Sequence, residues 1–355
     1  MFKKAIFTRK SEMINLLFPM IFFILMVIEY FYNINYLYTF SRQQNAFLTN
    51  IIFLNITHNA FTLILLTSTL PLYKWIDHHG GQETFWRKQV LIFSTMILFF
   101  GLLIYFSHQY RFVFFVFVLI NFLFAAHHAL SQTFGLSLLY TIDLPRDALF
   151  YKAEKIERFL FSTLMFSVLL SGSFYIMVSS RLFDFPLSMV QSFVKYSIWI
   201  KFLLALMLVI HPFYFFKKDY LGKSFFNLRY LIWPFTIIST TAIFATTSIH
   251  GIEYGLVTRK MIKNDSLRRP ILAFMLIAAV IVFAVIRIDN YEKIRSGQYL
   301  APWLILISSV SVAFSFLHYY LDRRLFKMRH QINRETVGLL LFNNPDEHRN
   351  SDAKS

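Results

Sequence analysis

Long apolar runs recur along almost the whole chain, and they constrain its fold more than any other feature of the sequence. A helix needs about 20 apolar residues to cross the hydrocarbon core of a bilayer, and most of these runs reach that length. Hydrophobic residues make up 57% of the 355 positions, which is typical of an integral membrane protein. The runs lie at residues 13–32, 46–72, 88–107, 112–141, 158–179, 190–216, 226–257, 270–288 and 301–321. The sequence therefore predicts an all-α fold, a polytopic transmembrane bundle of eight or nine helices.

The polar segments between the runs are short, and none of them is long enough to form a separate soluble domain. We therefore expect one integral membrane helical domain over residues 1–342. Residues 343–355, NNPDEHRNSDAKS, are polar and predict a disordered cytoplasmic tail. Cysteine is absent, which excludes disulfides, thiolate metal ligands and cysteine nucleophiles.

The net charge of +16 comes mainly from Lys and Arg at the ends of the apolar runs. Such a bias marks cytoplasmic loops, so the expected partner is the lipid bilayer and not a nucleic acid. Basic groups near both ends, Lys3 and Lys4 at one and 322–334 at the other, predict cytoplasmic termini in a bacterial inner membrane. Two cytoplasmic termini require an even number of crossings, whereas nine runs are odd. One element within residues 190–260 is therefore not a simple crossing.

Four histidines interrupt the apolar runs, and each has a polar neighbour on the same helical face. Ionisable residues inside a span are costly and face the interior of the bundle, which makes them candidates for a functional site. Residues three or four positions apart share one face of a helix. The pairs are Asn55 and Thr62 around His58, Gln132 after His128, Glu253 and Tyr254 after His250, and Asp322 after His318.

Neutral imidazole is a common ligand for iron, zinc and copper, and its second nitrogen usually needs an orienting acceptor. The sequence thus predicts one buried metal site whose ligands converge in the inner half of the bilayer. His127 is the alternative to its neighbour, because only one of the two can lie on the Gln132 stripe. The candidate metal ligands are His58, His127, His128, His250, His318 and Asp322, and the candidate catalytic residues are Glu253, Tyr254 and Gln132.

Other polar positions are interpreted more simply. We expect Gly135 to allow a close helix approach, Lys201 to snorkel to the membrane surface, and His211 to lie at the interface beside Pro212. Residues 143–158 predict a surface segment whose basic groups could bind an anionic headgroup.

Two motifs carry a resemblance to known families. The pattern His128-x-x-x-Gln132-x-x-Gly135 and the segment HYYLD that begins at His318 resemble motifs of uncharacterised bacterial multipass membrane proteins. The pairs of histidine and acidic residue are also loosely similar to those of the membrane β-carotene dioxygenases, which implies an iron-dependent reaction. The paired-histidine motifs of that family and the dense histidine boxes of the membrane desaturases are absent here.

These patterns favour a membrane-embedded, metal-dependent oxygenase or oxidase with iron as the cofactor, acting on a lipid or isoprenoid as its apolar small-molecule substrate. A haem-binding electron-transfer protein and a proton-coupled transporter are the alternatives, with haem the less favoured cofactor. A fourth possibility is that the polar residues only specify helix packing. The sequence leaves the oligomeric state open.

Overall fold

The computed structural model is built from helices, and the described part of the chain contains no strand. This confirms the all-α fold class. The structure describes residues 58–67, 69–107, 109–141, 147–179, 185–216, 221–236, 240–264, 270–295, 298, 300–327 and 330–342, with a few positions between 17 and 28. The expected first span at 13–32 falls mostly outside the described residues, as does the predicted tail at 343–355.

Five of the described helices are long and apolar enough to cross a membrane. Their outward surfaces carry large apolar side chains, such as Leu91, Leu98 and Phe159, at exposed fractions above 65%. So many exposed apolar side chains favour a surface that faces lipid, which supports a membrane protein. The five candidate spans are α4 (Gly81–Ser107), α5 (Arg111–Leu139), α6 (Ala148–Ser179), α7 (Leu187–Phe216) and α11 (Pro302–Leu325).

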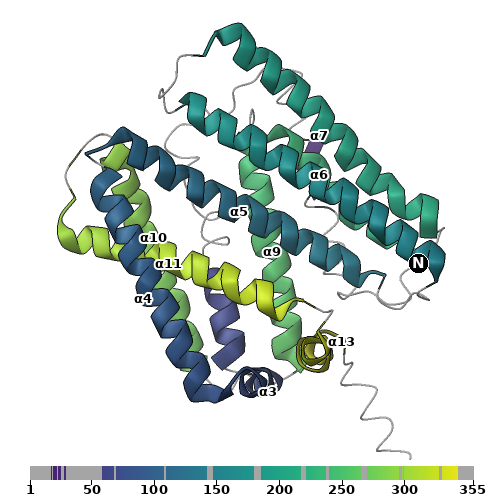
Figure 1. Cartoon of the computed structure of the whole chain (residues 1–355). Helices are drawn as coiled ribbons and strands as arrows, with labels where there is room; N and C mark the ends of the chain where they lie inside the picture. The colour runs from purple at the N-terminus through teal and green to yellow at the C-terminus, as the bar shows by residue number, and fades with distance from the viewer. Residues whose placement is uncertain are drawn as a thin grey trace, which may run out of the picture. The chain divides into compact units, whose positions relative to one another are not determined.

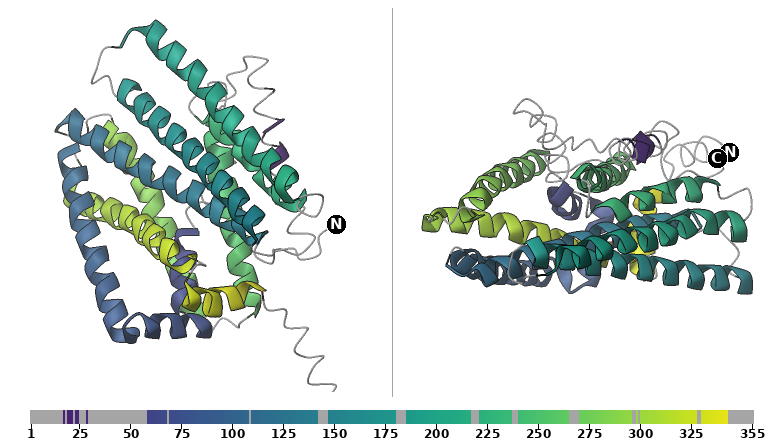
Figure 2. Two further views of the ribbon diagram at one scale, coloured as in Figure 1. Left: turned by 45° about the vertical axis from the view of Figure 1, so that its right-hand side comes forward. Right: turned by 90° about the horizontal axis from the view of Figure 1, so that it is seen from above.

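The chain divides into two compact units, each described on its own. The first unit contains α5, α6 and α7, with α6 packed against both of the others (Figures 1 and 2). Its core is apolar and includes Leu130, Phe134, Phe161 and Leu208. It also contains the short helices α8 (Leu221–Asn227) and η2 (Leu228–Phe235) and the first half of α9 (Thr240–Asn264).

The second unit is organised around α11, which packs against α4 and against α10 (Pro270–Arg295) (Figure 1). Most of α11 is buried, as a central helix requires. The unit further contains the helical segment His58–Thr67, α3 (Leu70–His78), the second half of α9, and the short elements α12 (Gln331–Asn333), η3 (Arg334–Gly338) and α13 (Leu339–Phe342).

Local chemistry explains where several helices begin. The carboxylate of Asp147 accepts a hydrogen bond of 2.7 Å from the backbone N–H of Phe150, so it caps the N-terminus of α6. Pro302 occupies the first turn of α11, where its missing N–H costs nothing. Gly80 and Gly81 have positive φ angles of 107° and 80°, and they form the turn that separates α3 from α4.

Some predicted boundaries are wrong. The run 226–257 is not one helix, because it contains the end of α8, the 3₁₀ helix η2 and only the first part of α9. Pro234 lies inside η2 and cannot donate the backbone hydrogen bond that a continuous α-helix needs. The expected surface segment at 143–158 is helical from Ala148, since the Asp147 cap starts α6 there.

Candidate metal centre

His58 and His318 lie together in the second unit. His58 is at the start of the segment His58–Thr67, and His318 is on α11. Their ring centroids are 4.7 Å apart in an edge-on arrangement, and a nitrogen of one ring lies within 4.8 Å of a nitrogen of the other. Both side chains are almost completely buried. Two potential nitrogen ligands from distant parts of the chain therefore share one apolar interior.

A hydroxyl network fixes the carboxylate beside this pair. Asp322 is one helical turn after His318 on α11, and its Oδ1 accepts hydrogen bonds from Thr62 Oγ1 at 2.5 Å and from Tyr254 Oη at 2.7 Å. The two hydroxyl oxygens are themselves 2.6 Å apart. All of these side chains are buried, so the network holds the orientation of the carboxylate in a medium of low dielectric.

The same network assigns the protonation of His318. Thr62 Oγ1 lies 2.7 Å from His318 Nδ1, and the single proton of the Thr62 hydroxyl is donated to Asp322. Nδ1 must therefore be the donor in its contact with Thr62. In the neutral ring the lone pair is then on Nε2, which is the atom that binds a metal when Nδ1–H is held by a hydrogen bond.

His318 Nε2 and Asp322 Oδ2 face each other at 3.5 Å. Two ligand atoms bound at about 2.1 Å to one tetrahedral ion lie about 3.4 Å apart. The observed separation is compatible with two ligands of one ion, and it is equally compatible with an ion pair between a protonated imidazole and the carboxylate.

Tyr254 also contacts the histidine pair directly. Its ring centroid lies 5.1 Å from that of His318 and 5.8 Å from that of His58. Glu253 precedes it on α9 and is fully buried, so α9 contributes a second buried carboxyl group. Asn59 adds a further link, because its amide donates to Ser315 Oγ at 3.2 Å and so joins its helix to α11.

The first unit contains a second histidine pair. The rings of His128, on α5, and His250, on α9, are 5.0 Å apart and perpendicular, and both are buried. His127 is only partly buried. Gln132 follows one turn after His128 and is also partly buried. Of the two adjacent histidines, His128 is therefore the one whose ring faces another candidate ligand.

The structure bears on three expectations for other residues. A side chain at Gly135 would meet nothing within 4 Å, so no helix in the described part of the chain approaches closely there. Lys201 does not snorkel, because its side chain is fully buried and donates to Ser171 Oγ at 3.0 Å. His211 is buried near the end of α7, and its expected place at the membrane interface stays a prediction.

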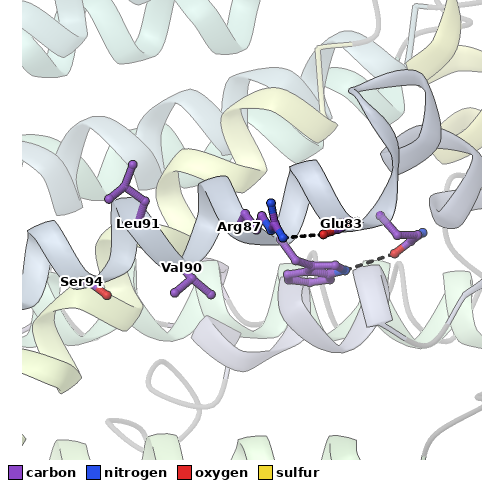
Figure 3. Close-up of a pocket in the computed structure, with 7 residues that line it drawn as sticks. Glu83, Arg87, Val90, Leu91 and Ser94 are labelled. Atoms are coloured by element: carbon purple, nitrogen blue, oxygen red, sulfur yellow. Dashed lines mark hydrogen bonds and ion pairs between the residues drawn. The ribbon is translucent and has the colours of Figure 1, made fainter.

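A shallow apolar depression lies along the first turns of α4, and it contains none of the predicted site residues (Figure 3). Glu83 and Arg87 form an ion pair of 2.6 Å there, and Trp86 donates to Gln82 at 3.1 Å. Tryptophan and charged groups at the end of an apolar helix are typical of the membrane interface. This depression therefore marks the end of the candidate span α4.

The sequence pattern identified the histidines and Asp322, whereas the hydrogen-bonded partners could not be derived from it. Thr62 was recognisable only as a polar residue on the face of His58, and its contacts with His318 and Asp322 span about 260 positions of the chain. Comparison with models of known protein families, with curated proteins and with solved structures finds no match.

Proposed function

We propose that the protein is a membrane-embedded, metal-dependent oxidoreductase whose ion is held by His58, His318 and Asp322. The observation that carries the proposal is the spacing of His318 Nε2 and Asp322 Oδ2 beside the ring of His58. Two histidines and one carboxylate form the ligand set of non-haem iron oxygenases, which keep positions of the ion open for reactants. Iron is therefore the metal that we expect.

The chain's own residues would prepare this centre in three ways. Thr62 holds His318 in the tautomer that presents Nε2, and Thr62 and Tyr254 together hold Oδ1 of Asp322. Burial excludes water from the ligands. A bound ferrous ion would supply the ability to activate oxygen, which none of these side chains has.

The surroundings support an apolar substrate. The helices that carry the ligands belong to a chain with 44 Phe residues and five helices apolar enough to cross a membrane. A lipid or isoprenoid could reach such an interior from the bilayer, whereas a polar metabolite would lose its hydration. The prediction that His128 and His250 bind the same ion stays a prediction.

Metal analysis tests the proposal. We expect the protein extracted in a mild detergent to contain a stoichiometric transition metal, and the variants His58→Ala and His318→Ala to lose at least nine-tenths of it. His78→Ala is the matched control, because His78 is exposed at the end of α3 and should leave the metal content unchanged.

Two results would reject the metal centre. The first is a folded wild-type protein without stoichiometric metal after reconstitution with ferrous ion, and the second is equal metal loss in His78→Ala. A Soret band in the visible spectrum would instead assign the histidines to haem.

A further inference from the structure

The helix α6 is longer than the hydrocarbon core of a bilayer, and its two parts differ in composition. It has 32 residues, which gives a length of about 48 Å by the helical rise. Residues 159–179 contain no charged side chain and cover about 31 Å, which matches a core about 30 Å thick. A crossing by these residues leaves residues 148–158 in the headgroup layer.

All charged residues of α6 lie within residues 148–158, and the acids among them are already paired. Arg158 Nε donates to Glu154 Oε1 at 3.0 Å, and the buried Glu157 forms an ion pair of 2.7 Å with a lysine of α8. Lys152 and Lys155 are exposed, and no acid of the described residues forms an ion pair with them. The exposed surface of these turns therefore keeps an excess of positive charge.

The two lysines share one face of α6 with large apolar side chains further along the helix. This face, the α6 strip, comprises Lys152, Lys155, Phe159, Phe166 and Leu170. With 3.6 residues per turn, the five positions fall within a sector of about 60° around the helix axis. The three apolar side chains are exposed at 69%, 65% and 51%, so none of the described helices covers the strip.

The order of groups along the strip matches that of a phospholipid molecule. The ammonium groups of Lys152 and Lys155 lie at the end that extends into the headgroup layer, where they can donate to phosphate oxygens. Phe166 follows Lys155 by about 16 Å along the axis, which is close to half the thickness of the core. One leaflet's acyl chain therefore has the length to cover the apolar part of the strip.

A second copy of the chain fits the strip less well than a lipid does. Two copies in one membrane have the same orientation, so a two-fold contact through the strip would bring the lysines of one copy against those of the other. Like charges placed opposite each other disfavour association. An anionic headgroup instead neutralises both lysines.

We propose that the α6 strip binds an anionic phospholipid, whose phosphate contacts Lys152 and Lys155 and whose acyl chains lie against Phe159 and Phe166. Basic groups at a membrane surface attract anionic lipids, and apolar side chains below them retain the chains. The strip lies wholly on α6 in the first unit. The proposal is therefore independent of the proposed metal centre.

The test compares two lipids by native mass spectrometry of the full-length protein in an uncharged maltoside detergent. Phosphatidylglycerol and phosphatidylcholine with identical acyl chains are added at equal concentration, so that only the headgroup differs. The key variant combines Lys152→Gln with Lys155→Gln. The matched control combines Lys74→Gln with Lys195→Gln, which removes two exposed charges from α3 and α7. Thermal unfolding verifies that each variant is folded.

We expect the wild-type protein to retain phosphatidylglycerol in preference to phosphatidylcholine. The key variant should bind phosphatidylglycerol about 30-fold more weakly, because each basic group near an anionic headgroup contributes about fivefold. The control should change this affinity less than about threefold. Glycerol phosphate, which has the headgroup chemistry without acyl chains, should not displace the lipid at the same concentration.

Several results would overturn the proposal. Equal retention of both lipids by the wild-type protein, or an unchanged affinity in the key variant, would remove the role of the lysines. Equal weakening in the control would assign the preference to the net charge of the protein. Displacement by glycerol phosphate would exclude the apolar part of the strip from binding. A lipid-free dimer that Phe159→Ala abolishes would assign the strip to a second copy of the chain.

Discussion

Replacing Thr62 by Val tests the hydroxyl network at the proposed metal centre. The substitution keeps the branched shape of the side chain and removes one oxygen atom, which lies within 2.5–2.7 Å of Asp322, Tyr254 and His318. The variant therefore loses the donor to the carboxylate and the acceptor that fixes the tautomer of His318. Because Thr62 is completely buried, water cannot easily replace either contact.

The size of the effect follows from these lost contacts. Hydrogen bonds to charged groups contribute about 1.5–3 kcal/mol, whereas bonds between membrane helices average about 0.6 kcal/mol. We expect the free energy of unfolding to fall by about 1–2 kcal/mol. Loss of a partner that orients a ligand weakens metal binding about 10–100-fold, which corresponds to about 1.4–2.8 kcal/mol.

Competition with a chelator of known affinity measures the metal affinity, and thermal unfolding in the same detergent measures stability. Thr69→Val is the control, because Thr69 is equally buried and its hydroxyl donates to the backbone carbonyl of Leu65, four residues before it, at 2.7 Å. A folded Thr62→Val protein with wild-type metal affinity would refute the role of the network. Equal losses in both variants would show that hydroxyl removal merely loosens the fold.

Two further predictions concern the first unit, and both are read from unfolding in detergent. Lys223→Met should cost about 3–5 kcal/mol because it leaves the Glu157 carboxylate buried without its cation, and adding Glu157→Gln should recover most of that loss; a neutral single variant would contradict the buried ion pair. Gly172→Ala should cost about 1–3 kcal/mol because its Cβ would collide with the Phe122 ring. Adding Phe122→Leu should relieve this collision, and an unrelieved loss would indicate a backbone effect at Gly172.

Hydropathy predicted the five long apolar helices that the structure describes, since lipid selects for apolar side chains over the full length of a crossing helix. It failed at residues 226–257 because an averaged hydropathy does not register Pro234 or the buried Arg229. The expectation that the Lys201 side chain reaches the membrane surface is wrong for another reason. The partner of that side chain, Ser171, lies 30 residues away on a neighbouring helix, and no local pattern reveals the contact.

Helical spacing predicted which polar residues share a helical face with the histidines, but it could not predict contacts between helices. The four-residue interval between His318 and Asp322 places both on one face of α11, and the structure brings them to 3.5 Å. The same rule placed Thr62 on the face of His58. It could not show that this hydroxyl would contact His318 and Asp322, because that contact depends on how two helices pack.

The candidate metal ligands that each unit offers explain why we propose the ion in the second unit. Stable transition-metal sites in proteins use at least three protein ligands. The second unit supplies two histidines and a carboxylate whose orientation is fixed by hydrogen bonds. In the first unit, Gln132 lies one turn after His128 on the same face of α5, and a neutral amide is a weak ligand for iron. The pair of His128 and His250 would bind a metal well only with further ligands, whereas our proposal gives the second unit three ligands, His58, His318 and Asp322.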